Sequence, residues 1–272
     1  MGKFDGILLC TDLDDTLLTD DKRVSEKNAA ALRYFMDEGG KFTFATGRVP
    51  HGASLMLGYI TPNAPMVCFN GGAIYDCAAE RYLWQAELGM DALRAAEFID
   101  NAMPSVGIEV CTDDKIFFCR TNEVVEEHKR MENFPDNYLD YHLIPAPWRK
   151  VMFITDEENI PALRKIINES EFYDKFSFVQ SSPWYYELLP KGAEKGPGML
   201  RLADMLGIDR KRTIGMGDNE NDITLVRDAG IGVAVANASE LVKSAASVIA
   251  PDNNSDAVAA VIKMLENGEI SF

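Results

Sequence analysis

The sequence lacks the features that define several large classes of protein. It contains only five cysteines and three histidines, and no two cysteines form a CxxC pair. The odd number of cysteines and their position within apolar stretches favour reduced core residues over a disulfide framework or a zinc site. His51, His128 and His142 are scattered, so neither a histidine-rich metal site nor a serine triad is supported.

Long apolar runs and an excess of basic residues are also absent. No apolar run reaches the ~20 residues of a membrane helix, and MGKFDGILLCTD becomes acidic too early for a secretory signal. The 43 Asp and Glu exceed the 27 Lys and Arg, for a formal net charge of -16, which disfavours nucleic acid and anionic membranes as partners. The loop GxxxxGK[ST] is missing, which argues against a nucleotide-triphosphate motor. We expect a cytoplasmic monomer or small homo-oligomer.

Apolar strand-like runs alternate with helical runs near both ends of the chain. The expected strands are 6–11, 41–46, 64–70, 212–217 and 231–236. Helices are expected between them, the first with Ser25 as its N-cap. Strands that are apolar throughout and separated by helices are typical of a parallel sheet covered on both faces. These segments therefore predict an α/β fold with a doubly wound parallel sheet.

The middle of the chain has a different pattern. Hairpins are expected near 73–88 and at 108–120, and the second of them turns at Asp113-Asp114. Helices are expected at about 91–102 and 160–169. Further strands are expected at 151–155, 176–180 and 185–189. Residues 132–150, with three prolines, read as an irregular connection. Hairpins mixed with helices predict an α+β domain inserted into the first fold. The expected domains are 1–83 with 190–272 as the core, and 84–189 as the insertion.

Three carboxylates follow the first expected strand, in the stretch LLCTDLDDTLLT. A surface turn explains one Asp after a strand, but like charges as close as Asp12, Asp14 and Asp15 disfavour each other's ionisation unless a cation compensates. Ligands bind outside the carboxyl ends of parallel strands, and Mg²⁺ prefers carboxylates and other oxygen ligands. The stretch therefore predicts a metal site.

A second acidic cluster, GMGDNENDITL, follows another expected strand. Asp12 and Asp218 can share one ion if both strands lie in the same parallel sheet. Asn221 and Asp222 open the next helix, where they could also serve only as capping residues that favour the helix dipole.

Polar residues with possible phosphate contacts follow other strands. Thr46, Gly47 and Arg48 end the second strand in FATGR, where a hydroxyl and backbone N–H groups suit a phosphate oxygen. Lys195, in PKGAEKG, could neutralise a phosphoryl group. Each signal alone is weak, because Thr-Gly is usually a turn and a surface lysine is usually solvated.

The ordered set of motifs resembles the haloacid dehalogenase (HAD) superfamily of phosphohydrolases. The motifs are DLDDT (12–16), Thr46 of FATGR, Lys195 in EKG, and GDNEND (217–222). The resemblance covers nearly the whole chain and is strongest for the Cof-type branch with a type II α/β cap. It implies a Rossmann-like core and a cap, the inserted domain, that closes over the site, excludes water and selects the leaving group.

The resemblance also implies catalytic roles. Asp12 would attack phosphorus to form an aspartyl-phosphate. Asp14 would protonate the leaving oxygen and then activate water, which calls for a raised pKa. Mg²⁺ would be held by the carboxylates of Asp12 and Asp218 and the backbone carbonyl of Asp14. Thr46 and Lys195 would stabilise the transferring charge.

Four further residues have less certain roles. Asn221 is expected to orient Lys195 or the phosphate, and Asp222 to support the site from behind. Arg48 could contact substrate or pair with an acid on the core surface. Asn70, in FNGG, could contact substrate or simply belong to a polar turn. Asp15 stands where the family usually has Gly, and we expect it to face outward or bond nearby backbone rather than take part in catalysis.

The predicted function is a Mg²⁺-dependent phosphatase acting on a small phosphorylated metabolite, such as a sugar phosphate, a nucleotide-like monophosphate or a phosphorylated cofactor. A phosphotransferase, including a sugar phosphomutase, shares the covalent step and differs in the acceptor. A non-catalytic sensor that binds a phosphometabolite is the third reading. The pair Asp12 and Asp14 argues against it, because binding alone does not need an acid/base beside a nucleophile.

Overall fold

The computed structural model describes residues 2–54, 58–113 and 115–272. The chain folds into two units, Met1–Gln85 with Glu194–Phe272, and Ala86–Ala193. The second unit begins two residues later and ends four residues later than the predicted 84–189. The expected turn at Asp113-Asp114 extends outside the described residues.

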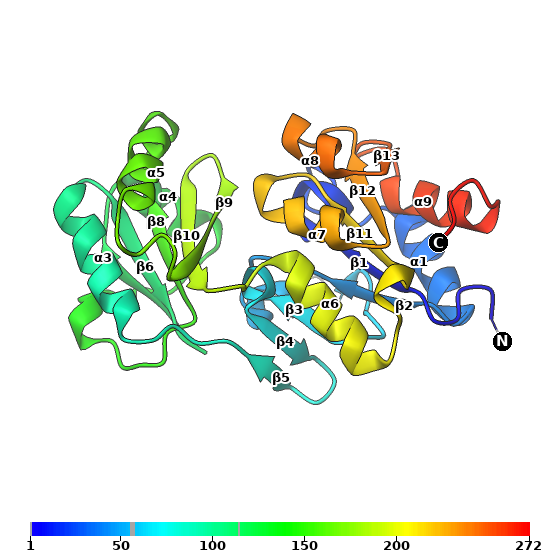
Figure 1. Cartoon of the computed structure of the whole chain (residues 1–272), viewed down its shortest axis with the longest axis horizontal. Coiled ribbons are helices and arrows are strands. Elements are labelled where there is room, and N and C mark those ends of the chain that lie inside the picture. The colour runs from blue at the N-terminus through cyan, green and yellow to red at the C-terminus, as the bar shows by residue number, and fades with distance from the viewer. Residues whose placement is uncertain (1, 55–57, 114) are drawn as a thin grey trace. The chain divides into compact units, whose positions relative to one another are not determined.

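The first unit is built on a five-stranded parallel sheet (Figure 1). Its strands are β1 (Leu8–Thr11), β2 (Lys41–Phe44), β11 (Thr213–Gly217), β12 (Ile231–Val235) and β13 (Val248–Ala250). Their order is β13-β12-β11-β1-β2, and every neighbouring pair is parallel. All residues of β1 and β11 are buried, as expected for strands covered on both faces. The predicted doubly wound sheet is confirmed.

The direction of strand order reverses between β1 and β11. From β1 the chain moves to β2 on one side, whereas from β11 it moves to β12 and β13 on the other. The register pairs Leu8 with Thr213 and Thr11 with Met216, so the carboxyl ends of the two strands lie side by side. A reversal of this kind opens a crevice above the sheet, where α/β proteins bind ligands.

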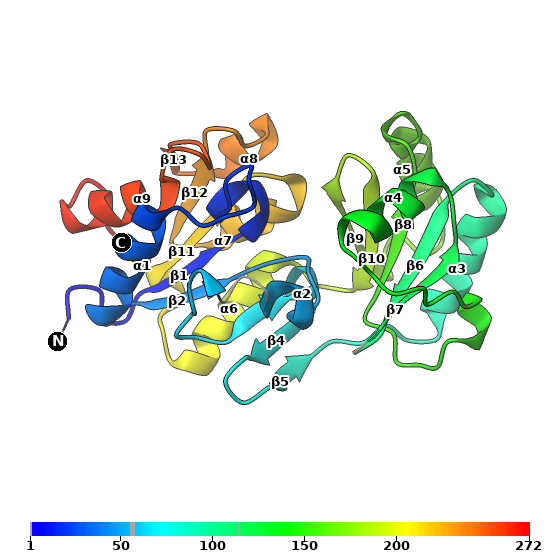
Figure 2. The same cartoon turned by 180° about the vertical axis from the view of Figure 1, so that it is seen from behind.

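Helices cover both faces of this sheet. They are α1 (Glu26–Asp37), α2 (Pro50–Ser54), α6 (Lys195–Leu206), α7 (Ile223–Asp228), α8 (Glu240–Ala245) and α9 (Ala257–Glu266). Helices α6 and α7 pack together and share a core cluster with Leu8 and Cys10 of β1. Helix α1 contacts α9 and is seen best from behind (Figure 2). Ser25 caps α1 as predicted, its hydroxyl accepting from the Asn28 N–H at 3.1 Å.

A small antiparallel sheet extends the first unit. It contains β3 (Met66–Cys68), β4 (Ala73–Asp76) and β5 (Arg81–Gln85). A parallel bridge between Ala45 and Val67 joins β3 to the end of β2. The strand expected over 64–70 stops at Cys68, because Phe69–Gly71 forms the 3₁₀ turn η3.

The second unit is an antiparallel sheet with three helices. Its strands, in the order β7-β6-β8-β10-β9, are β7 (Ile116–Arg120), β6 (Gly107–Cys111), β8 (Lys150–Ile154), β10 (Tyr185–Pro190) and β9 (Phe176–Ser182). The helices are α3 (Asp91–Ala102), α4 (Glu123–Met131) and α5 (Ile160–Asn168). This is the expected inserted α+β domain, although α4 was not predicted. Within the described part of the chain, no helix is both long and apolar enough to span a membrane.

Candidate active site

Asp12 and Asp218 lie at the reversal point of the core sheet. Asp12 directly follows β1, and its N–H donates to the carbonyl of Met216 in β11 at 2.9 Å. Asp218 directly follows β11. The two residues are 206 positions apart in sequence, and the pairing of β1 with β11 brings them together. The predicted convergence of the two acidic motifs is therefore present.

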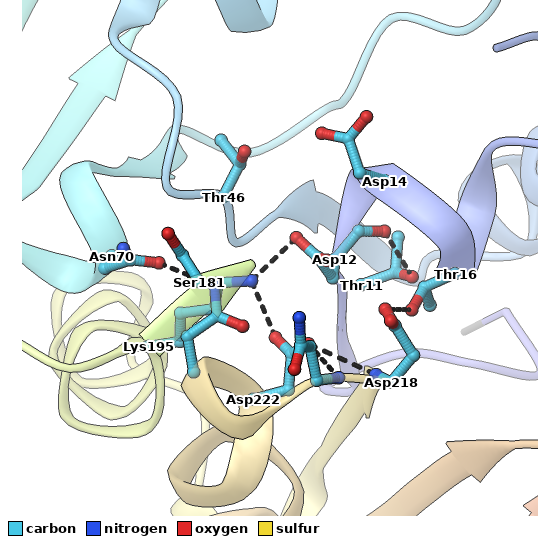
Figure 3. A network of polar contacts seen from close by, with 12 residues as sticks. Thr11, Asp12, Asp14, Thr16, Thr46, Asn70, Ser181, Lys195, Asp218 and Asp222 are labelled. Atoms are coloured by element: carbon cyan, nitrogen blue, oxygen red, sulfur yellow. Dashed lines mark hydrogen bonds and ion pairs between the residues drawn. The ribbon is translucent and has the colours of Figure 1, made fainter. Parts of the chain in front are cut away.

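The ammonium group of Lys195 bridges two carboxylates (Figure 3). Nζ lies 2.7 Å from Oδ1 of Asp12 and 2.6 Å from Oδ1 of Asp222, and the lysine side chain is fully buried. Lys195 is the first residue of α6, which fixes its backbone beside the sheet. Burial disfavours the ammonium form, but Asp12 and Asp222 outweigh it and hold the pKa of Lys195 above its ordinary value.

Asp222 binds Lys195 directly. The sequence predicted only that it supports the residues that contact substrate or metal. Oδ1 of Asp222 accepts from Lys195, and its Oδ2 accepts from the N–H groups of Asp218 and Asn219 at 3.1 Å each. Asp222 also takes part in a capping box with Asn219. Helix capping and a direct bond to Lys195 are thus functions of one carboxylate.

Asp12, Asp218 and Asp222 form a cluster of carboxylates whose ligand atoms lie within 4.8 Å of one another. Burial and the charge of Asp222 raise the pKa of Asp12, and the same two causes raise that of Asp218 to about 7. Both pKa values stay raised although Lys195 lowers them, so the positive charge of Lys195 does not fully offset the negative charge of the cluster. Within the described residues, no hydrogen bond uses Oδ2 of Asp12 or Oδ2 of Asp218. This donor set fits a hard divalent cation.

Asp14 is held by a cation rather than by an apolar pocket. It lies in the turn η1 (Leu13–Leu17), and Arg48 donates to both of its carboxylate oxygens. Burial favours the neutral acid, but the hydrogen bonds and charge of Arg48 outweigh it and hold the pKa of Asp14 below its ordinary value. The acid role had led us to expect a raised pKa, and the structure gives the opposite direction, because Arg48 pairs with an acid of the core.

Thr46 and Gly47 follow β2, next to the end of β1. The Thr46 hydroxyl accepts from the N–H of Arg48 at 3.1 Å, and the Thr46 N–H donates to the carbonyl of Val67. A Cβ added to Gly47 would lie 3.0 Å from Nδ2 of Asn70, so this position is tightly packed. Figure 3 shows Thr46 on the same side of Asp12 as Asp14.

Asn70 and Asn221 pair with each other. Nδ2 of Asn221 donates to Oδ1 of Asn70 at 3.0 Å, and both side chains are buried. Oδ1 of Asn221 has no hydrogen-bond partner among the described residues. The sequence interpretation expected Asn221 to orient Lys195 or the phosphate. Lys195 is bonded to Asp12 and Asp222 rather than to Asn221, and the contact of Asn221 with phosphate stays a prediction.

Two contributors had no role in the sequence interpretation. Thr16 donates to Oδ1 of Asp218 at 2.6 Å and so links the two acidic motifs. Its place as the last residue of DLDDT was the available signal. Lys22 contacts Asp14 at 3.4 Å and Asp15 at 3.1 Å, and no motif pointed to it. Asp15 has φ 54° and an exposed side chain, as expected.

Comparison with known proteins identifies the family. The family of haloacid dehalogenase-like hydrolases matches residues 9–262, which is nearly the whole chain. The chain belongs to this family. The predicted family and its hydrolase class are thereby confirmed.

Curated relatives and solved structures match the HAD-like chain over nearly its full length. Two relatives from Bacillus subtilis (strain 168) are named 5-amino-6-(5-phospho-D-ribitylamino)uracil phosphatase. YitU is 27% identical and YcsE 26% identical, each over 94% of this chain, covering 96% and 94% of the relatives. A solved structure described as the HAD subclass IIB sugar phosphatase BT4131 aligns with a TM-score of 0.82 at 21% identity, covering 97% of this chain and all of that one. The fold, including the inserted α+β domain, is thus that of this subclass.

Proposed function

We propose that this protein is a phosphatase that hydrolyses a small phosphorylated metabolite through an aspartyl-phosphate on Asp12. The observation that carries the proposal is the Asp12–Lys195–Asp222 contact at the reversal point of the sheet, with Asp218 in the same cluster. A carboxylate fixed beside a buried ammonium group can attack phosphorus while that ammonium offsets the charge of the phosphoryl oxygens. The relatives named as phosphatases support this reaction.

In the first half of the reaction, a carboxylate oxygen of Asp12 forms a bond to phosphorus. The bond between phosphorus and the ester oxygen breaks, and its electron pair stays on that oxygen. Because Arg48 favours the ionised form of Asp14, this step draws on the fraction of the enzyme in which Asp14 is protonated. In that fraction Asp14 transfers its proton to the leaving oxygen and becomes a carboxylate. Lys195 and the Thr46 hydroxyl stabilise the charge on the phosphoryl oxygens.

In the second half, a water oxygen attacks the phosphorus of the aspartyl-phosphate. Asp14 takes a proton from this water, and the bond between phosphorus and the Asp12 oxygen breaks. The products are inorganic phosphate, a restored Asp12 carboxylate and a protonated Asp14. The protein is then ready for another ester.

Mg²⁺ is the proposed cofactor. Oδ2 of Asp12, Oδ2 of Asp218 and the backbone carbonyl of Asp14 would hold it, because both oxygens of Asp222 already accept hydrogen bonds. When bound, the ion supplies positive charge for the phosphoryl oxygens. Thr16 keeps Asp218 oriented for this purpose.

The second unit is proposed to act as the cap that selects the leaving group, since many activities share one core fold. The named substrate of YitU and YcsE carries a phosphorylated ribityl chain, and a phosphorylated polyol or sugar is the proposed substrate class here. We also propose a cytoplasmic monomer or small homo-oligomer that binds no nucleic acid, in keeping with its net charge of -16.

The proposal is tested by phosphate release from a panel of phosphate monoesters with Mg²⁺ and with EDTA. We expect turnover in Mg²⁺ that EDTA abolishes and that Asp12→Asn lowers by at least about 10³-fold. Asp15→Asn is the matched control, since this neighbouring carboxylate is exposed and Asn tolerates its positive φ. If the wild-type protein binds phosphate but releases none from any ester, it is a non-catalytic sensor of a phosphometabolite and the phosphatase proposal is wrong.

The acceptor separates hydrolysis from phosphoryl transfer. In water enriched in ¹⁸O, a phosphatase places the label in inorganic phosphate, because water attacks the aspartyl-phosphate. Phosphate that appears on a second sugar, without labelled inorganic phosphate, would make the protein a phosphotransferase.

A further inference from the structure

The guanidinium group of Arg48 binds both oxygens of the Asp14 carboxylate. Nε donates to Oδ2 at 2.9 Å, and Nη2 donates to Oδ1 at 3.0 Å. A two-point contact between planar groups fixes the plane of the carboxylate as well as its position. The side chains of Arg48 and Asp14 are 23% and 35% exposed, so the pair is partly shielded from water. The orientation of Asp14 is therefore set by Arg48.

The backbone of Arg48 is itself held by the strand ends that form the site. Its N–H donates to the Thr46 hydroxyl at 3.1 Å, and its carbonyl accepts from the N–H of Phe69 at 3.2 Å. Because β1 and β2 are neighbouring parallel strands, the loops that follow them lie side by side. Arg48 thus ties the loop after β2 to the carboxylate after β1.

Lys22 is a second cation at the same carboxylate, but its contact has a different character. Nζ lies 3.4 Å from Oδ1 of Asp14, and the lysine side chain is 53% exposed. The ammonium group of Lys22 contacts one oxygen of Asp14 and one of Asp15, so it cannot fix the plane of the Asp14 carboxylate. Exposed ion pairs also contribute little energy. Lys22 therefore offers a matched control for the loss of one positive charge beside Asp14.

We propose that Arg48 is a positioning residue that orients Asp14 for its two proton transfers and that it does not bind the phosphoryl group. This role rests on the proposed phosphatase function. The proton given to the leaving oxygen and the proton taken from water both travel along directions set by the carboxylate plane. Rotation of that plane slows both transfers and leaves the affinity for phosphate unchanged.

The test compares Arg48→Gln in the wild-type protein and in Asp14→Asn. In the wild-type background we expect kcat to fall about 10²-fold, the cost of a misplaced catalytic group. KM and the inhibition constant of inorganic phosphate should stay within about threefold. In the Asp14→Asn background the same change should alter kcat by less than about threefold, because the carboxylate it orients is already gone. Lys22→Gln should lower kcat clearly less than Arg48→Gln does, because it removes one positive charge beside Asp14 and leaves the two-point contact in place.

Three outcomes would overturn the role of Arg48 in a protein that is otherwise an active phosphatase. Equal losses of kcat in both backgrounds would show that Arg48 acts independently of Asp14. A raised KM with weaker phosphate inhibition and unchanged kcat would assign Arg48 to the phosphoryl group. Full activity of Arg48→Lys would show that charge suffices without the two-point contact. Failure of the proposed function has its own signature: the wild type then hydrolyses no monoester, and this inference falls with it.

Discussion

At the residue scale, the site is a balance between buried carboxylates and one buried ammonium group. Lys195 is shared between Asp12 and Asp222, which leaves Asp218 without a cation in direct contact among the described residues. A partly buried carboxylate with no cation beside it favours its neutral form, even though Thr16 donates one hydrogen bond to it. The metal-free site should therefore respond to pH through Asp218.

Asp218→Asn should flatten the pH dependence of stability in the metal-free protein. Burial and Asp222 raise the pKa of Asp218 from 3.8 to about 7, so the folded state binds this proton more tightly than the unfolded state. Its contribution to stability is full below pH 3.8 and is lost as pH rises to about 7. Urea denaturation in EDTA across this range should show wild type losing stability relative to Asp218→Asn, whose amide cannot ionise.

If the free energies of unfolding of wild type and Asp218→Asn change with pH in the same way, Asp218 is not the group whose ionisation lowers stability. Added Mg²⁺ provides a control, because a bound cation favours the ionised carboxylate. We expect it to remove the loss of wild-type stability near pH 7 and to leave Asp218→Asn unaffected.

The sequence predicted which residues meet at the site better than it predicted how they pair. Asp12 and Asp218 were predictable because each follows an apolar strand of one parallel sheet, and the sheet alone brings such positions together. The partners of Arg48 and Asp222 were not, because spacing does not tell which way a loop side chain turns. Both bind residues of the core, Asp14 and Lys195.

At the element scale, the 3₁₀ turn η3 contains three consecutive residues with positive φ. Phe69, Asn70 and Gly71 have φ values of 52°, 52° and 96°. Left-handed backbone is costly for a bulky residue and persists only where the surroundings enforce it. A Cβ on Gly71 would lie 2.0 Å from the carbonyl oxygen of Glu194, the residue before Lys195. The turn therefore sets the start of α6.

Gly71→Ala should disturb both stability and catalysis. We expect the free energy of unfolding to fall by about 2 kcal/mol or more and kcat to fall as well, because Glu194 must move and Lys195 follows it. Gly207→Ala is the matched control at the other end of α6, with φ 67° and nothing within 4 Å of the added Cβ. It should cost only about 1 kcal/mol of backbone strain and leave kcat intact. If urea denaturation shows that Gly71→Ala and Gly207→Ala lose the same free energy of unfolding, the contact of residue 71 with Glu194 does not contribute to stability.

Element prediction succeeded where burial was strong and failed for short or polar segments. Apolar runs identified β1, β2, β11 and β12, because these strands are buried throughout or nearly so. Helix α4 was missed, because Val125 is its single buried residue and charged residues fill most of the rest. Strand β13 and helix α8 were missed because three and six residues carry too little periodicity to recognise.

At the scale of the whole molecule, the net charge of -16 bears on metal binding. A strongly negative protein raises the local concentration of cations, and salt screens this attraction. We expect the Kd for Mg²⁺, measured by calorimetry, to rise several-fold between about 0.05 M and about 0.5 M KCl. An unchanged Kd would mean that the local carboxylates alone determine affinity. Asp218→Asn should abolish binding at both salt concentrations.

The order of units along the chain has a consequence for exchanging inserted domains between relatives. The chain returns to the first unit at Glu194, one residue before the lysine that holds Asp12. The atoms of Glu194 that lie nearest to a Cβ on Gly71 are backbone atoms, so a domain exchange must preserve the path of the chain into Lys195, whichever side chain precedes it. A graft that transplants residues 86–193 leaves that path to the recipient's own core, because both junctions then lie at the boundary between the units.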